Sequence, residues 1–152
     1  MFACLTTTFS ATARVGEFTI LKLDAFSPQR HVMPASVCTE HDRQGLKSTI
    51  FHLPSTKASP VHGEDVSWSA QSGLTDPEAA FAHHLHTNNP SNNGPLFAYC
   101  FKGGHWPLTK PKLIEVLAKG ARELGKVMAF RLGPLLSFYF REYPLTSLKV
   151  KG

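Results

Sequence analysis

The sequence has few cysteines and no long apolar run, and its N-terminus contains no basic residue before Arg14. The three cysteines are odd in number and lack the spacing of a disulfide framework, which favours a reducing compartment. No apolar run approaches the ~20 residues needed to cross a bilayer, and the N-terminus does not resemble a secretory signal. We therefore expect an intracellular protein, in the cytosol or the nucleus, with no membrane span.

Motifs for phosphate loops, hydrolytic nucleophiles and metal sites are also missing. Gly103-Gly104-His105 lacks the Lys-Ser/Thr ending of a phosphate-binding loop, and there is no Gly-x-Ser-x-Gly nucleophile elbow. Of His83, His84 and His86, only the first and last are spaced to touch one ion, and no Cys or carboxylate lies at convincing ligand spacing. These histidines are typical of a solvated helix end. We expect no metal and no other cofactor.

The length and the charge distribution are more informative. With 152 residues, 42% apolar and 11% aromatic, the chain can bury the core of one domain. Residues 1–100 carry six Lys/Arg and eight Asp/Glu, a net charge of −2, whereas residues 101–152 carry ten Lys/Arg and three Asp/Glu, a net charge of +7. A basic C-terminal third is suited to following a phosphate backbone, although a solvated helix face would have the same composition.

The first half of the chain predicts a small antiparallel sheet. Residues 18–24 alternate apolar and polar side chains and predict a first strand. Residues 37–39 and 48–53 predict two more, joined by a hairpin loop at 42–45 that contains a glycine. The Ser-, Pro- and Gly-rich stretch 55–74 predicts a loop, which we expect Val66 and Trp68 to anchor to the core.

The second half predicts mainly helices. A helix over 76–87 is indicated by Thr75 as its cap, followed by Asp76, Pro77 and Glu78. The clearest helix covers 109–125, with one apolar face. Thr109 and Pro111 indicate its start and Gly125 indicates its end. Before this helix, residues 96–101 predict a short strand, and after it further helices are predicted to begin at Pro134 and Pro144. The fold class is therefore α+β, with about three antiparallel strands packed against several helices.

Five short segments carry the most specific pattern, and in chain order they are Ala13-Arg14-Val15-Gly16-Glu17, Phe51-His52-Leu53-Pro54-Ser55-Thr56-Lys57, Gly94-Pro95-Leu96-Phe97, Pro107-Leu108-Thr109-Lys110 and Phe130-Arg131-Leu132-Gly133. Together they resemble the catalytic domain of tyrosine recombinases, the phage-integrase family. The likeness is greatest to copies derived from mobile elements in fungal genomes. It spans roughly residues 12–152, so it implies an integrase-like core for nearly the whole chain.

The resemblance implies a role for three basic residues. In that family a tyrosine attacks a DNA phosphate and becomes covalently joined to it. Two arginines stabilise the charge on the non-bridging oxygens, while a lysine protonates the leaving sugar oxygen and a histidine helps to transfer protons. By position, Arg14 and Arg131 correspond to the two arginines and Lys57 to the lysine. The resemblance also implies double-stranded DNA as partner, a nuclear location and no cofactor.

Two features depart from the family pattern. Met128 occupies the place of the histidine in His-x-x-Arg, and a thioether cannot exchange a proton. The nucleophilic tyrosine of the family lies further along than this chain reaches, because Tyr139 and Tyr143 are too close to Arg131 to replace it. We therefore expect residues 1–152 to form a single, incomplete catalytic domain that binds DNA without recombinase activity.

Each landmark also has an ordinary structural interpretation. Arg14 fits an exposed arginine at a helix end or strand entry, and Lys57 fits a solvated lysine in a turn. The guanidinium of Arg131 would be satisfied equally well by an ion pair with Glu123 or Glu142.

Two other function classes stay open. One is a non-enzymatic nucleic-acid-binding module that uses the basic face of residues 102–126. The candidate DNA-binding residues on that face are Lys110, Lys112, Lys119 and Arg122. The other is an inert product of a degenerate mobile element, which would expose apolar surface near the end of the chain and self-associate through it. The candidates for that surface are Leu145, Leu148 and Val150.

Overall fold

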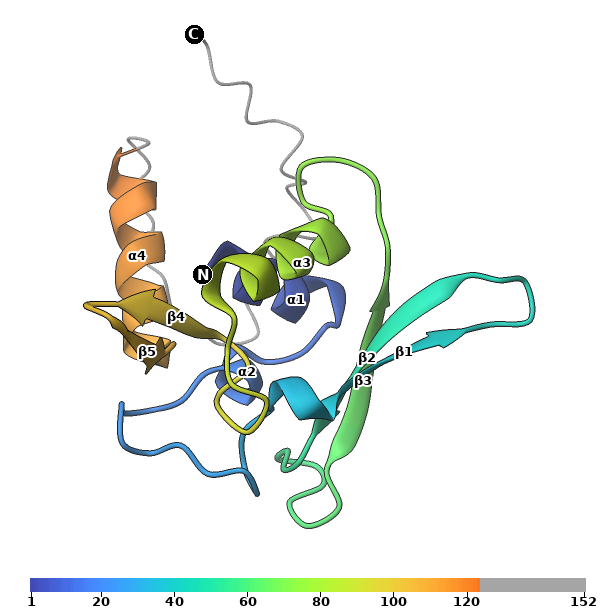
Figure 1. Cartoon of the computed structure of the whole chain (residues 1–152), viewed down its shortest axis with the longest axis horizontal. Coiled ribbons are helices and arrows are strands. Elements are labelled where there is room, and N and C mark those ends of the chain that lie inside the picture. Colours follow the sequence, from blue (N-terminus) through green and yellow to red (C-terminus); the bar gives the residue numbers. More distant parts are fainter. Residues whose placement is uncertain (124–152) are drawn as a thin grey trace, which may run out of the picture. The chain divides into compact units, whose positions relative to one another are not determined.

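The computed structural model describes residues 1–123 (Figure 1). These residues belong to two units, a first one of residues 1–116 and a second one that begins at Leu117. The first unit is a mixed α/β structure, as the sequence predicts. Its elements in chain order are α1 (Phe2–Ser10), α2 (Val15–Phe18), a short 3-10 helix η1 (Pro34–Ser36), β1 (Val37–His41), β2 (Lys47–Leu53), β3 (Glu64–Ser69), α3 (Pro77–Asn88), β4 (Ala98–Phe101), β5 (Gly104–Pro107) and the start of α4 (Lys110–Glu123). Helix α4 begins in the first unit and ends in the second.

The main sheet has three antiparallel strands in the order β1-β2-β3. The predicted hairpin between its first two strands is confirmed, and Figure 1 shows it extending from the sheet. The Asp42 carboxylate closes the turn by accepting hydrogen bonds from the backbone N–H groups of Gln44 at 2.7 Å and Leu46 at 2.9 Å. Gly45 supplies the positive φ of +82° that such a turn needs.

The third strand of the sheet is not the predicted one. Residues 18–24 do not form a strand: Phe18 ends α2, and Ile20 makes only an isolated parallel bridge to Thr109. Strand β3 comes instead from the stretch 55–74, which was predicted to be a loop. The prediction that Trp68 anchors this stretch is confirmed, because its side chain is buried.

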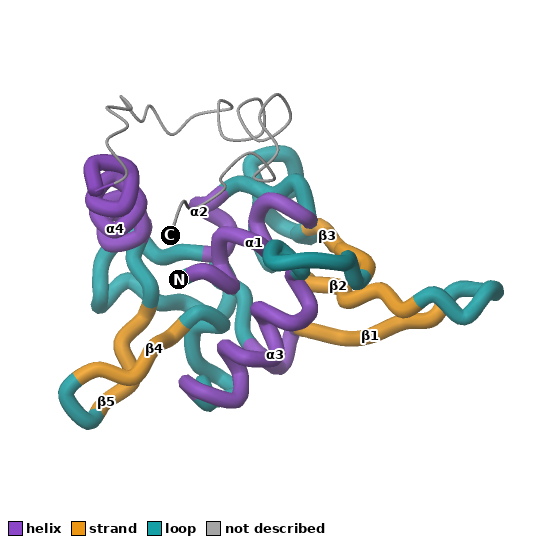
Figure 2. The backbone as a smooth tube through the Cα atoms, turned by 90° about the horizontal axis from the view of Figure 1, so that it is seen from above, coloured by secondary structure: helices purple, strands orange, loops and turns teal. Residues whose placement is uncertain are grey.

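The core lies between one face of the sheet and the helices. Phe51 of β2 is fully buried and its ring contacts three others. These are the rings of Phe18, Trp68 and Phe81, at centroid distances of 5.4, 4.3 and 5.5 Å. Helix α1, which the sequence did not predict, packs against α3 (Figures 1 and 2).

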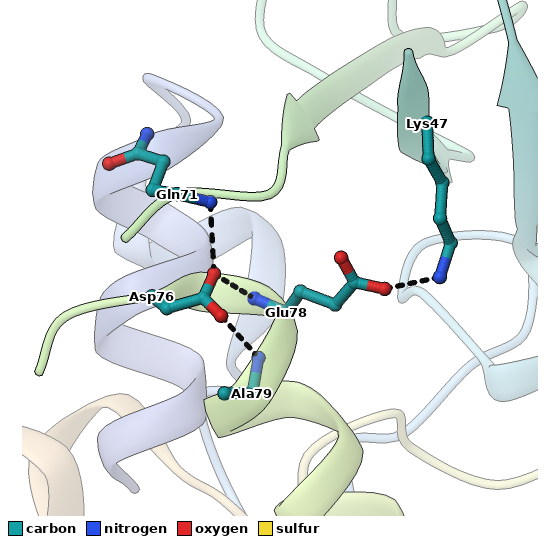
Figure 3. A network of polar contacts seen from close by, with 5 residues as sticks. All are labelled: Lys47, Gln71, Asp76, Glu78 and Ala79. Carbon is teal, nitrogen blue, oxygen red and sulfur yellow. Dashed lines mark hydrogen bonds and ion pairs between the residues drawn. The ribbon is translucent and has the colours of Figure 1, made fainter. Parts of the chain in front are cut away.

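Helix α3 confirms its prediction with one correction. The cap is Asp76 rather than Thr75: its carboxylate accepts hydrogen bonds from the backbone N–H groups of Glu78 and Ala79 at 3.1 and 3.2 Å (Figure 3). A carboxylate at this end also complements the helix dipole, which a threonine hydroxyl does not. The helix ends as expected, with Asn89 in the left-handed region at φ +42°.

The other predicted elements of the second half are partly covered by the described residues. Helix α4 agrees with the predicted helix over 109–125 as far as Glu123, and Thr109 Oγ1 accepts a hydrogen bond from Lys112 N at 3.3 Å. The predicted strand 96–101 is observed as β4, and β5 pairs with it in a separate two-stranded sheet. Gly125 and the helices predicted from Pro134 and Pro144 lie outside the described residues.

Candidate nucleic-acid interface

Arg14 lies immediately before α2, where its backbone is extended. The Arg14 N–H donates to Glu17 Oε2 at 2.8 Å, which fixes the first turn of this short helix. The side chain is exposed, and within residues 1–123 no hydrogen bond or ion pair engages its guanidinium. Arg14 therefore combines a backbone fixed by Glu17 with an exposed side chain that no described residue engages.

Lys57 lies in the loop that joins β2 to β3, and its side chain is exposed. Its neighbour Thr56 is buried and holds the loop: Thr56 Oγ1 donates to the Glu64 carboxylate and accepts a hydrogen bond from Ser59 N at 2.9 Å. Gly63 closes the loop against β2, because a Cβ at this position would lie 2.1 Å from Leu53 O. The loop is thus ordered around a lysine that points to solvent.

The three-residue phosphate clamp remains a prediction. Arg14 and Lys57 are carried by separate elements, and within the described part of the chain no hydrogen bond or ion pair joins them. Arg131, which would complete the clamp, and Met128, at the family's histidine position, lie outside the described residues.

The first turn of α4 carries two of the predicted DNA-binding lysines, Lys110 and Lys112, and no acidic residue. Lysines at the positive end of a helix dipole are the reverse of the stabilising arrangement. Lys112 Nζ pairs with the Glu115 carboxylate at 3.1 Å, an exposed contact that contributes little to stability. Lys119 and Arg122 lie further along α4, in the second unit, and both side chains are exposed.

Backbone hydrogen bonds place the segment after α2 beside the start of α4. Ile20 N donates to Leu108 O at 3.2 Å, and Lys110 N donates to Ile20 O at 2.9 Å. Ile20, which follows α2, therefore lies beside Lys110 at the start of α4, although the two are far apart in sequence. Periodicity gives no signal for such a contact, because it joins residues that are distant in the sequence.

Carboxylates are absent from a long stretch around these lysines. Between Glu78 and Glu115 the sequence contains no aspartate or glutamate. The same stretch contains three lysines, of which Lys102 was not among the predicted DNA-binding residues. Lys102 occupies the turn between β4 and β5, and the sequence signal that marks it is the pair Gly103-Gly104 after alternating aromatic residues. The positive charges of Lys102 and Lys110 therefore have no acidic neighbour in this stretch of the sequence, whereas Lys112 is paired with Glu115 at its end.

The histidines of α3 differ from the prediction. His83 and His86 are exposed, but His84 is buried, so the solvated-end interpretation is wrong for this residue. His84 Nε2 donates to Leu96 O at 2.9 Å, and its Nδ1 accepts from Asn88 Nδ2 at 3.1 Å. Burial lowers the pKa of His84, so the neutral ring is favoured. Within residues 1–123, no three His, Cys, Asp or Glu side chains are placed to hold a metal ion.

A hollow of about 300 Å³ lies between the β1–β2 hairpin and α3, where Val37, Phe81 and Leu85 contribute to its lining. The lining also includes Lys47 and Glu78, which form an ion pair with each other (Figure 3). Apolar walls and a neutralised charge pair do not suit a phosphate, so this hollow is not part of the candidate interface.

No protein-family model, curated protein or solved structure matches this chain. Among the described helices, none is both long enough and apolar enough to span a membrane.

Proposed function

We propose that the protein binds duplex DNA through its phosphate backbone. The observation that carries this proposal is the backbone pairing of Ile20, six residues after Arg14, with Lys110 in the first turn of α4, where two lysines precede the first carboxylate, Glu115. Arginine forms forked, charge-assisted hydrogen bonds with phosphate oxygens. Each neutralised phosphate also releases condensed counterions, which favours binding at low salt.

We further propose that this DNA-binding domain derives from a tyrosine recombinase and lacks strand-exchange activity. The order of the described elements supports this origin: an arginine before the sheet, a lysine in the loop after β2, and helices after the sheet. Met128 stands where the family has a proton-transferring histidine. The protein should therefore bind DNA without forming the covalent protein–DNA adduct of that family.

Binding of a fluorescein-labelled duplex at low salt, followed by anisotropy, tests the proposal. Arg14→Ala and Lys110→Ala should each weaken binding. Arg43→Ala is the matched control, because Arg43 is an exposed arginine in the turn of the β1–β2 hairpin, which carries none of the residues of the proposed interface. A control variant that weakens binding as much as Arg14→Ala would contradict a local site. Denaturing gels of the same mixtures should show no covalent adduct.

The same binding measurement distinguishes this proposal from a second candidate function, a nucleic-acid-binding module that uses the basic helix and has no recombinase origin. It is favoured by the exposed basic side chains along α4. In that case Lys112→Ala, Lys119→Ala and Arg122→Ala would weaken binding while Arg14→Ala would not. If the wild-type protein binds no duplex at low salt, both candidates fail and the inert interpretation stands.

A further inference from the structure

The β4–β5 hairpin has two different faces. Strand register pairs Cys100 with His105 and Tyr99 with Trp106. Because side chains alternate along a strand, the first pair lies on one face and the second on the other, together with Phe101. The ribbon therefore separates a face that bears Cys100 and His105 from an aromatic face formed by Tyr99, Phe101 and Trp106.

The face with Cys100 and His105 is attached to the end of α3. His105 Nε2 donates to Asn88 O at 2.6 Å, and Cys100 N donates to Asn88 Oδ1 at 3.1 Å. These contacts hold the ribbon on the first unit. Figures 1 and 2 show it as a two-stranded element separate from the main sheet. The aromatic face is consequently presented on a fixed support rather than on a loose loop.

The aromatic face is open at the tip of the ribbon. Phe101 is 47% exposed, and its ring is held by an edge-on contact with Trp106 at a centroid distance of 5.6 Å. Gly104, opposite Phe101, places no side chain over the ring. A half-exposed aromatic residue of this kind can take a stacked planar group, provided that the flexible Lys102 side chain, which lies over the ring, moves aside from the face it covers.

A positive charge adjoins this ring. Lys102 Nζ lies 5.5 Å from the Phe101 centroid. Lys102 and Gly103 form the turn with φ values of +48° and +78°. Asparagine or glycine is common at such positions and a lysine is not, so backbone preference does not account for Lys102. Its ammonium lies over the Phe101 ring in a cation–π contact, and a flexible lysine that yields this place to a stacking base stays within reach of the phosphate of that nucleotide.

We propose that the Tyr99, Phe101 and Trp106 face binds the unpaired bases of single-stranded DNA, with Lys102 contacting the adjoining phosphate. The chemistry that selects this occupant is the combination of an exposed aromatic ring, an adjacent cation and a carboxylate-free surrounding sequence. The proposal rests on the nucleic-acid binding proposed above and extends it from duplex phosphates to unpaired bases.

The test compares a labelled oligothymidylate, a single strand of the same length with abasic sites, and a duplex. Phe101→Leu keeps an apolar side chain but removes the ring. We expect it to weaken binding of the oligothymidylate by about five- to 150-fold, the range for loss of one base–aromatic stack. It should leave the abasic strand and the duplex unaffected. Phe101→Tyr should restore binding, and Phe2→Leu, at an exposed phenylalanine of α1, should have no effect.

Other results would overturn the proposal. Equal oligothymidylate affinity for the wild type and Phe101→Leu would do so, as would equal losses for the oligothymidylate and the abasic strand. Unchanged DNA binding combined with a shift of oligomeric state in Phe101→Leu would make the face a protein interface. The failures remain distinguishable: if duplex binding depends on Arg14 while oligothymidylate binding is unchanged in Phe101→Leu, only this inference is removed. Failure to bind any of the three DNAs at low salt removes the proposed function as well.

Discussion

Removing the ring of Phe51 should be the most damaging single truncation in the first unit. The side chain is fully buried, and it contacts the rings of Phe18, Trp68 and Phe81. It joins the sheet to α2 and α3 at one point. Phe51→Ala should cost about 3–5 kcal/mol, because the lost apolar burial is followed by a cavity that rigid neighbours cannot fill. A domain has a total free energy of unfolding of about 5–15 kcal/mol, so this substitution should remove a large part of it.

Urea denaturation followed by tryptophan fluorescence measures this loss. Trp68 stacks on Phe51 at a centroid distance of 4.3 Å, so its emission reports the same contact. Phe2→Ala, at an exposed position of α1, is the matched control and should change the free energy of unfolding by less than about 0.5 kcal/mol. Similar losses for the two variants would refute the reasoning, because Phe51 would not then be the centre of the core.

Three further predictions concern polar groups and backbone geometry. Burial lowers the pKa of His84 in the folded protein. The stability contributed by its neutral ring should therefore be complete above about pH 6.5, the pKa of histidine in the unfolded chain, and should decline as pH falls through the folded pKa. His84→Gln should flatten this part of a denaturation-against-pH curve. Hydrogen bonds, chiefly from the Gln71 backbone, lower the pKa of Asp76; Asp76→Ala should cost about 0.5–2 kcal/mol of cap stability in urea denaturation, with less effect in acid, where the native carboxylate is already protonated. Gly63→Ala should lower the melting temperature more than Gly45→Ala. Both glycines have positive φ, but only at Gly63 would the new Cβ meet a backbone oxygen, at 2.1 Å, and a reversed order would show that this close approach carries no strain.

Sequence patterns predicted helices and turns correctly where the stabilising contacts lie between residues close together in the sequence. The stretch Asp76-Pro77-Glu78 contains the cap and the first turn of α3, and Asp42 with Gly45 contains the turn of the β1–β2 hairpin. The apolar face of α4 gave its position as far as Glu123. In each case the decisive hydrogen bond or periodicity lies within a few residues.

The errors arose where distant residues decide the structure. The apolar–polar alternation of residues 18–24 predicted a strand, but Phe18 and Ile20 are buried whereas Leu21 and Leu23 are exposed. The segment passes the edge of the core, and its one strand-like pairing is the bridge between Ile20 and Thr109. Strand β3 was missed for the opposite reason. Its acidic and serine residues are typical of a loop, and its pairing with β2 through Val66 and neighbouring positions makes it a strand.

The candidate interface was only partly predictable for the same reason. The sequence identified Arg14 and Lys110 separately, and both lie on the neighbouring segments described above. The segments that carry them are joined through the hydrogen bonds between Ile20 and the residues around Thr109, which lie far apart in sequence. Lys102 was not predicted because its place depends on β5, for which the sequence pattern gives no signal.

The salt dependence of duplex binding tests the central claim most directly. The affinity of the wild type should fall linearly on a log–log plot against salt, and Arg14→Ala should make the slope shallower by about 0.9, the contribution of one phosphate contact. Arg43→Ala, which removes an equal charge from the β1–β2 turn, should leave the slope unchanged. Identical slopes for the wild type and Arg14→Ala, or no binding at low salt, would contradict a phosphate site at Arg14.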